Sequence, residues 1–237
     1  MRRRGIHETG REDYRTAVAS AQTRSPAQAQ EAQIGLCPRN TIIDKPLADN
    51  ERDLRTFHRW VREGKPILTS SCMRYAKEFI AVRKKLASVG EPRYLSMSTA
   101  KTWERYGIHA AEGLYPILGP GFLSVRNSGS MHRNIVHCKH QCGADVVFIA
   151  NKDMYGGFCR LSVMGTKGAM DVPFKDTFFA FKSQLQAYVQ FLRTGKRPFP
   201  WEETVELMKT IIAGIRSREE GAREVFLKEV QVVRGHL

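Results

Sequence analysis

The chain has 237 residues, of which 42% are hydrophobic, so it can bury the core of one large domain, or of one domain and part of another. Its net charge of +14 attracts anions such as nucleic acid, anionic lipid or phosphorylated small molecules. The basic residues are spread along the chain, however, and no apolar run is long enough to cross a bilayer. We therefore expect neither a nucleic-acid partner nor a membrane span.

Residues 1–40 differ in composition from the rest of the chain. They are rich in Arg, Ala, Gln and Glu, and Tyr14 is their one aromatic residue. A segment this poor in large apolar side chains buries too little surface to offset the entropy of ordering it. We expect it to be disordered or weakly helical.

Residues 41–90 alternate between strand and helix patterns. The predicted elements are a strand at 41–43, a helix that begins at Asp49 or Asn50 and ends at Gly64, a strand at 66–69, and a helix carrying Tyr75, Phe79, Val82 and Leu86 that ends at Gly90. This order is typical of an α/β fold.

Residues 91–237 read differently, because strands follow one another with short turns. The predicted elements are a strand at 93–99, a helix at 103–118 broken by Pro116, strands at 122–128, 134–142, 145–151 and 158–164, two helices, and a last strand at 225–230. In the first of these two helices we expect an inner stripe of Leu185, Tyr188, Val189 and Leu192. In the second we expect Val205, Met208, Ile211, Ile212 and Ile215.

Several different short motifs follow one another between residues 41 and 230. They are Ile42–Ala48 with the run Asp-Lys-Pro-Leu-Ala, Gly64–Ile67 followed by Ser71–Tyr75, Tyr106–Glu112, Gly165–Ala169, and Gly195–Pro198 followed by Glu202–Glu220. Each motif alone is weakly specific, but their order and spacing together resemble the glucose–fructose oxidoreductase / inositol dehydrogenase / MocA (Gfo/Idh/MocA) family.

The resemblance implies a fold and an activity. Residues 41–90 would be the C-terminal remnant of a Rossmann domain. Residues 91–237 would be an α/β (α+β) substrate and oligomerisation domain, with a large, mostly antiparallel open sheet flanked by helices. The family uses NAD or NADP to oxidise or reduce a hydroxyl or carbonyl group on a sugar, polyol or related compound. We therefore expect a sugar-like small-molecule substrate and a homo-oligomer formed through the sheet.

Lys45 and His109 are the candidate catalytic residues. Hydride transfer from an alcohol needs a group that accepts the hydroxyl proton and a cation that stabilises the developing alkoxide. Lys45 follows a predicted strand, where ligands of α/β sheets bind, and Pro46 biases it to an extended backbone. His109 is the expected proton acceptor, because a histidine side chain ordinarily titrates near neutral pH. The alternatives are a surface lysine in a turn and a buried histidine bonded to a backbone carbonyl.

Four further residues complete the predicted site by resemblance. We expect Pro46 and Arg74 to contact the cofactor, and Arg74, Tyr106 and Glu112 to contact the substrate together with Lys45. For Arg74, an ion pair at the start of a helix is the alternative.

The sequence departs from the family pattern in two ways. Many members have an aspartate four residues before the histidine, whereas this chain has Arg105, which favours a neutral imidazole. No G-x-G-x-x-G run precedes Lys45, and that run supplies the backbone amides that bind pyrophosphate. We therefore expect an N-terminally truncated, cofactor-deficient oxidoreductase. The alternative is a non-catalytic remnant that serves as an oligomerisation or ligand-binding module.

The five cysteines have irregular spacing, and no apolar stretch follows the basic start, which indicates a reduced, cytoplasmic protein. Cys138, His140 and Cys142 would share one face of a strand. Structural zinc sites usually combine two closely spaced cysteines, such as Cys138 and Cys142, with a second pair of ligands elsewhere in the chain. We expect a sheet face with chance thiols and no metal.

Overall fold

The computed structural model describes residues 41–154 and 158–232. The prediction for residues 1–40 lies outside the described residues. Apart from Thr41, the described residues belong to one compact unit that begins at Ile42. No helix in these two ranges is both long and apolar enough to span a membrane.

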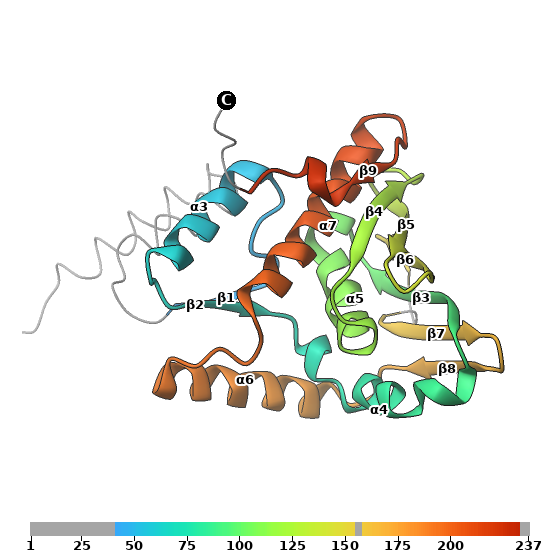
Figure 1. The fold of residues 1–237 in the computed structure, drawn as a ribbon, viewed down its shortest axis with the longest axis horizontal. Helices are drawn as coiled ribbons and strands as arrows, with labels where there is room; N and C mark the ends of the chain where they lie inside the picture. The colour runs from blue at the N-terminus through green and yellow to red at the C-terminus, as the bar shows by residue number, and fades with distance from the viewer. Residues whose placement is uncertain (1–40, 155–157, 233–237) are drawn as a thin grey trace, which may run out of the picture. The chain divides into compact units, whose positions relative to one another are not determined.

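Strands β1 (Thr41–Asp44) and β2 (Ile67–Ser70) form a two-stranded sheet, with helix α3 (Glu51–Arg62) between them in the chain (Figure 1). Asn50 caps α3, because its side chain accepts a hydrogen bond from the Asp53 amide at 3.0 Å. Of the two predicted caps, Asn50 is therefore the one used. The helix buries Leu54 and Phe57.

The helix predicted after β2 consists of three pieces. They are the 3₁₀ helix η1 (Cys72–Tyr75), helix α4 (Lys77–Lys85) and the 3₁₀ helix η2 (Leu86–Val89). Ala76 separates the first two because its backbone is extended, with ψ at 120°. Tyr75 and Leu86 therefore lie outside the α-helix. Gly90 ends the segment with φ at 75°, a conformation that favours glycine.

A seven-stranded sheet forms the larger part of the structure (Figure 1). Its strands are β3 (Pro92–Ala100), β4 (Phe122–Asn127), β5 (Arg133–His140), β6 (Asp145–Asn151), β7 (Arg160–Gly165), β8 (Ala169–Pro173) and β9 (Val225–Phe226). Their order is β8-β7-β3-β6-β5-β4-β9, and the pair β3–β6 is parallel while the other neighbours are antiparallel. The predicted mixed α/β fold with a mostly antiparallel sheet is confirmed.

The ends of this sheet differ from the prediction. β8 was not expected; it pairs with β7 across the predicted Gly165–Gly168 turn. The last strand was expected at 225–230, but β9 stops at Phe226 and the chain continues as the 3₁₀ helix η3 (Leu227–Glu229). Edge strands bury few side chains, so their sequence pattern is weak.

Helices α5 (Trp103–Leu118) and α7 (Trp201–Glu219) cover one face of the sheet (Figure 1). Trp103 is fully buried between them, and its indole N–H donates to the Ile211 carbonyl at 3.0 Å. A Cβ at Gly107 or Gly214 would collide with the Trp103 ring, so these glycines allow the close packing. The predicted break at Pro116 is wrong, because α5 continues through it to Leu118.

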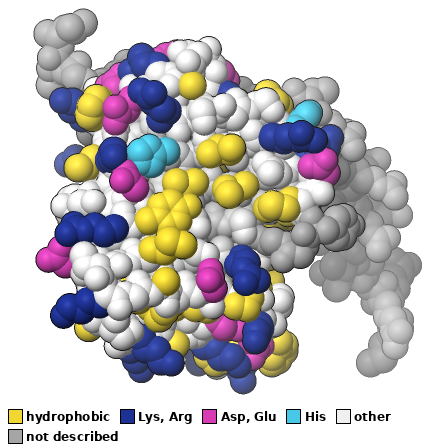
Figure 2. Space-filling model, turned by 90° about the vertical axis from the view of Figure 1, so that its right-hand side faces the viewer, with side chains coloured by type: hydrophobic (Ala, Val, Ile, Leu, Met, Phe, Trp, Pro, Cys, Tyr) yellow, Lys and Arg dark blue, Asp and Glu magenta, His cyan; other side chains and the backbone are white. Residues whose placement is uncertain are grey.

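The opposite face of the sheet is partly apolar. Ile135, Val147 and Ile149 alternate along β5 and β6 with buried residues, and Ile135 is 51% exposed. Figure 2, viewed from the side of Figure 1 where the strands lie, shows hydrophobic side chains gathered near the middle of that face with charged side chains around them.

Helix α6 (Thr177–Thr194) does not bury the predicted stripe. Tyr188 is buried, but Leu185 and Val189 are 58% and 43% exposed. The helix turns Gln184 and Tyr188 inward instead, where the Gln184 amide and the Tyr188 hydroxyl donate to the Ser70 carbonyl at 2.6 and 3.0 Å. These hydrogen bonds fix the end of β2, next to Ser71.

Candidate functional site

The candidate site lies where the ends of β1 and β2 approach helix α5. Lys45 directly follows β1, Ser71 directly follows β2, and His109 lies in the middle of α5. The Lys45–Pro46 peptide bond is cis. The fold therefore brings together two strand ends and one helix that lie far apart in the sequence.

His109 is buried, with 4% of its surface exposed. Its Nδ1 lies 2.7 Å from the Ser71 hydroxyl, which also accepts a hydrogen bond from the Met73 amide at 3.2 Å. The alternative of a histidine bonded to a backbone carbonyl does not describe this contact. When Nδ1 carries the proton and donates to Ser71, Nε2 is left to accept a proton. The rings of Tyr106 and Phe158 lie 4.8 and 5.4 Å from the imidazole.

Burial, followed by the charge of Lys45, lowers the pKa of His109 to about 3; Lys101 acts in the same direction and Asp44 opposes it. The imidazole is therefore neutral at neutral pH, in the direction expected from Arg105. The nearby cations responsible are instead Lys45 and Lys101, and Arg105 is exposed. Among the described residues, the two acidic side chains nearest His109 along α5 have other partners, since Glu104 pairs with Arg218 and Glu112 pairs with Arg74.

The two lysines near His109 have different partners. The Lys45 ammonium lies 2.7 Å from the Asp44 carboxylate, and its side chain is 18% exposed. The Lys101 ammonium donates to the Tyr106 hydroxyl at 2.7 Å and lies 4.4 Å from the centre of the Tyr106 ring. Sequence reasoning missed Lys101. Its place directly after β3 and just before α5 is the one signal that could have indicated it.

Arg74 and Glu112 contact each other in a separate buried network. The Arg74 guanidinium bonds the Glu112 carboxylate and, at 2.6 Å, the Glu203 carboxylate, and it stacks over the Phe199 ring at 4.0 Å. Burial raises the pKa of Glu112, while Arg74 opposes this shift. Arg74 therefore forms the ion pair that the sequence analysis gave as the alternative to ligand binding. A role of either residue in binding substrate or cofactor stays a prediction.

The cysteine and histidine run on β5 does not keep the expected common face. Cys138 and His140 are buried, whereas Cys142 is exposed in the following turn, with its sulfur 3.1 Å from His140 Nδ1. In the part of the chain that the structure describes, no group of three or more potential metal ligands forms.

No protein-family model matches the sequence, and no curated protein matches it. Several solved structures, however, are similar to this chain. A myo-inositol dehydrogenase from Corynebacterium glutamicum aligns with a TM-score of 0.70 and 17% identity, covering 86% of this chain and 78% of that one.

Two further structures are similar. An oxidoreductase from Agrobacterium radiobacter, solved with NAD+, L-tartaric acid and magnesium, aligns with a TM-score of 0.73 and 14% identity, covering 87% of this chain and 79% of its own. The apo scyllo-inositol dehydrogenase from Lactobacillus casei aligns with a TM-score of 0.70 and 11% identity, covering 86% and 78%. Identity this low establishes the fold. The chain therefore has the fold that these dehydrogenases and oxidoreductases share.

Proposed function

We propose that the chain is an oxidoreductase of the Gfo/Idh/MocA family that acts on a hydroxyl or carbonyl group of a sugar, polyol or related compound. One observation carries the proposal: His109 is held 2.7 Å from the hydroxyl of Ser71, which follows β2, and Lys45 follows the neighbouring strand β1, so the fold gathers residues of separate motifs. The ordered motifs and the shared fold support the same assignment.

In this proposal the protein moves a proton and stabilises a negative charge. The Lys45 ammonium donates a hydrogen bond to the substrate oxygen and favours its alkoxide form. Neutral His109 accepts the hydroxyl proton at Nε2 while Ser71 holds Nδ1. A nicotinamide cofactor, when bound, supplies the hydride chemistry.

The described residues do not fit the pyrophosphate of a dinucleotide. The turn from β1 to α3 runs from Lys45 to Asn50 and the turn from β2 to η1 consists of Ser71, and neither contains glycine. Close approach of backbone amides to a pyrophosphate needs a glycine-rich turn that leads into a helix. We therefore assign no step to NAD(P). We propose that residues 41–90 are part of a Rossmann unit that binds the cofactor with low affinity.

The second candidate function is a cytoplasmic, non-catalytic module that binds a ligand or forms homo-oligomers. The partly apolar sheet face with Ile135, Val147 and Ile149 favours association through residues 91–237. The glycine-free turns favour the loss of catalysis. These two observations are the support for the second candidate.

Two measurements separate the candidates. The oxidoreductase proposal predicts weak but saturable heats on titration with NAD+ or NADP+, and reduction of the cofactor at 340 nm with at least one compound in a panel of inositols, sugars and sugar acids. Lys45→Ala and His109→Ala should each lower that rate by about 10²–10⁴-fold. Lys196→Ala, a lysine in the exposed turn after α6, is the control. Flat heats with both cofactors would support the non-catalytic module. Unaltered turnover in Lys45→Ala or His109→Ala would refute the catalytic role proposed for the substituted residue.

A further inference from the structure

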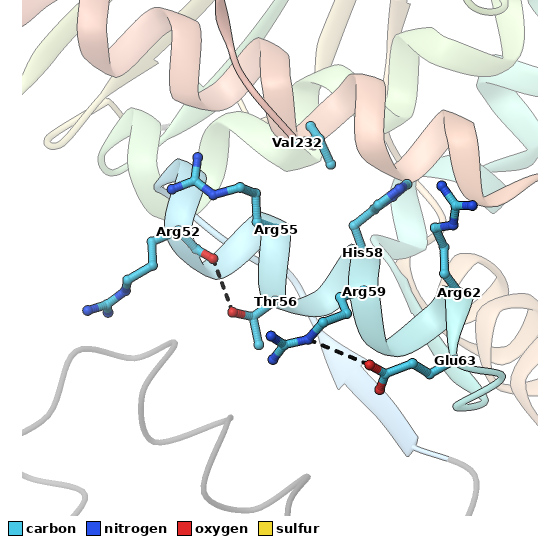
Figure 3. A pocket seen from close by; sticks show the side chains of 8 residues that line it. All are labelled: Arg52, Arg55, Thr56, His58, Arg59, Arg62, Glu63 and Val232. Carbon is cyan, nitrogen blue, oxygen red and sulfur yellow. Dashed lines mark hydrogen bonds and ion pairs between the residues drawn. The ribbon is translucent and has the colours of Figure 1, made fainter. Parts of the chain in front are cut away.

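A basic pocket lies on the outer face of α3. It has a volume of about 570 Å³ and is lined by four arginines, His58, Thr56, Glu63 and Val232 (Figure 3). Volumes in this range hold small-molecule ligands. Among the described lining residues, Val232 is the one aliphatic side chain, so this part of the pocket suits a polar ligand.

The arginines follow the period of the helix. Arg52, Arg55, Arg59 and Arg62 are spaced three or four residues apart, so they lie along one face of α3 over roughly 15 Å. Figure 3 shows Arg55 and Arg62 on the side of α3 toward Val232, and Arg52 and Arg59 on the other side. The guanidinium groups therefore form two rows along α3, one on the side of Val232 and one directed away from it (Figure 3).

The present partners of these arginines leave charge available. Arg62 has no ion-pair partner among residues 41–154 and 158–232. Arg59 and Glu63 are 3.7 Å apart, and both side chains are more than half exposed, so this pair contributes little. Arg55 bonds Glu51 and the Gln231 carbonyl, each at 3.2 Å. Arg52 pairs with the buried Asp53 at 3.0 Å. Among the described residues of the lining, Glu63 is the one acidic side chain beside four arginines.

His58 adds a neutral donor. Its Nδ1 accepts a hydrogen bond from the Trp201 indole at 3.1 Å, so Nε2 carries the proton. Burial, followed by the charge of Arg62, lowers the pKa of His58, which keeps the ring neutral at neutral pH. The pocket thus combines guanidinium forks with a fixed N–H donor.

We propose that this pocket binds a small molecule that carries two phosphate groups. Guanidinium groups bind phosphate oxygens through paired, charge-assisted hydrogen bonds. A single phosphate reaches arginines about one helical turn apart, whereas four arginines over roughly three turns accommodate two. The site lies apart from His109 and does not depend on the proposed oxidoreductase activity.

The test is titration with inorganic pyrophosphate, followed by calorimetry and by amide chemical shifts. We expect saturable binding that weakens with salt, with shifts concentrated at Thr56, Glu63 and Val232. Arg59→Gln and Arg62→Gln should each weaken binding about tenfold, and the double variant more. Arg193→Gln on α6 is the matched control, since it removes one exposed arginine outside the pocket; we expect a change below about twofold.

Several outcomes would overturn the proposal. These are the absence of saturable pyrophosphate binding to the wild type, shifts spread over the basic surface, or an equal loss of affinity in Arg193→Gln. Tighter binding of a DNA oligonucleotide than of pyrophosphate, lost in the same arginine variants, would make the pocket part of a nucleic-acid surface instead. Pyrophosphate binding should persist in Lys45→Ala, so failure of the proposed catalytic function leaves this test intact.

Discussion

The 3₁₀ helix η1 and its preceding residue contact helix α5 at two points, and the two contacts have opposite electrostatic character. At the first, the Ser71 hydroxyl bonds a neutral imidazole, His109, beside two lysines. At the second, three residues further along each element, Arg74 and Glu112 form an ion pair extended by Glu203. The first contact leaves a titratable nitrogen available, whereas the second uses its charges to hold η1, α5 and the start of α7 together. The same two elements thus hold both the proposed catalytic histidine and a supporting ion pair.

The largest effect should come from breaking the ion-pair contact. Glu112→Ala leaves Arg74 buried with Glu203 as its remaining carboxylate, which should lower the free energy of unfolding by about 3–5 kcal/mol. Urea denaturation measures it. Glu91→Ala, which breaks an exposed pair with Arg93, should cost less than about 1 kcal/mol. A similar cost for both variants would contradict the supporting role of the Arg74 network.

Acid should weaken the histidine contact. The pKa of His109 is lowered from 6.5 to about 3 in the folded chain, so between these values the unfolded chain binds more protons. Stability is fully present above pH 6.5 and is lost as the pH falls toward 3, by up to about 4 kcal/mol from this group. Comparing wild type with His109→Gln at several pH values isolates this loss. Parallel stability profiles for the two proteins would show that His109 is not held neutral.

Removing the serine should have a smaller effect. Ser71→Ala deletes the hydrogen bond to His109 and the bond that caps η1 at the Met73 amide, so we expect a loss of about 1–2 kcal/mol. Thermal unfolding provides the measurement. Ser88→Ala, an exposed serine in η2, should change stability by less than about 0.5 kcal/mol. A neutral Ser71→Ala variant would mean that this contact contributes nothing to the site.

The smallest effect is expected for Tyr106→Phe. The change removes the hydroxyl that accepts from Lys101 but keeps the ring beside His109. Because Lys101 is exposed, we expect a loss below about 0.5 kcal/mol in the same thermal assay. A loss above about 1.5 kcal/mol would show that Lys101 is a structural part of the first contact.

Much of the fold was predictable, because helix and strand periods are local. Asn50 capping α3, the length of α5 and the strands β3 to β7 follow from residues close in sequence. The errors occurred where distant contacts decide. The inner face of α6 was misassigned because the polar residues Gln184 and Tyr188 bond the backbone of Ser70. Strand β8 was missed because its pairing with β7 supplies the order that its short sequence lacks.

The sequence by itself determined that Lys45 follows a strand, that His109 and Glu112 lie one turn apart on a helix, and that the ordered motifs resemble one oxidoreductase family. The tertiary structure decided their partners: Ser71 for His109, Arg74 for Glu112, and Lys101 as a second cation near the imidazole. The physical reason is range. Backbone period and capping depend on neighbours along the chain, whereas the pKa of a buried group depends on burial and charges that only folding brings close.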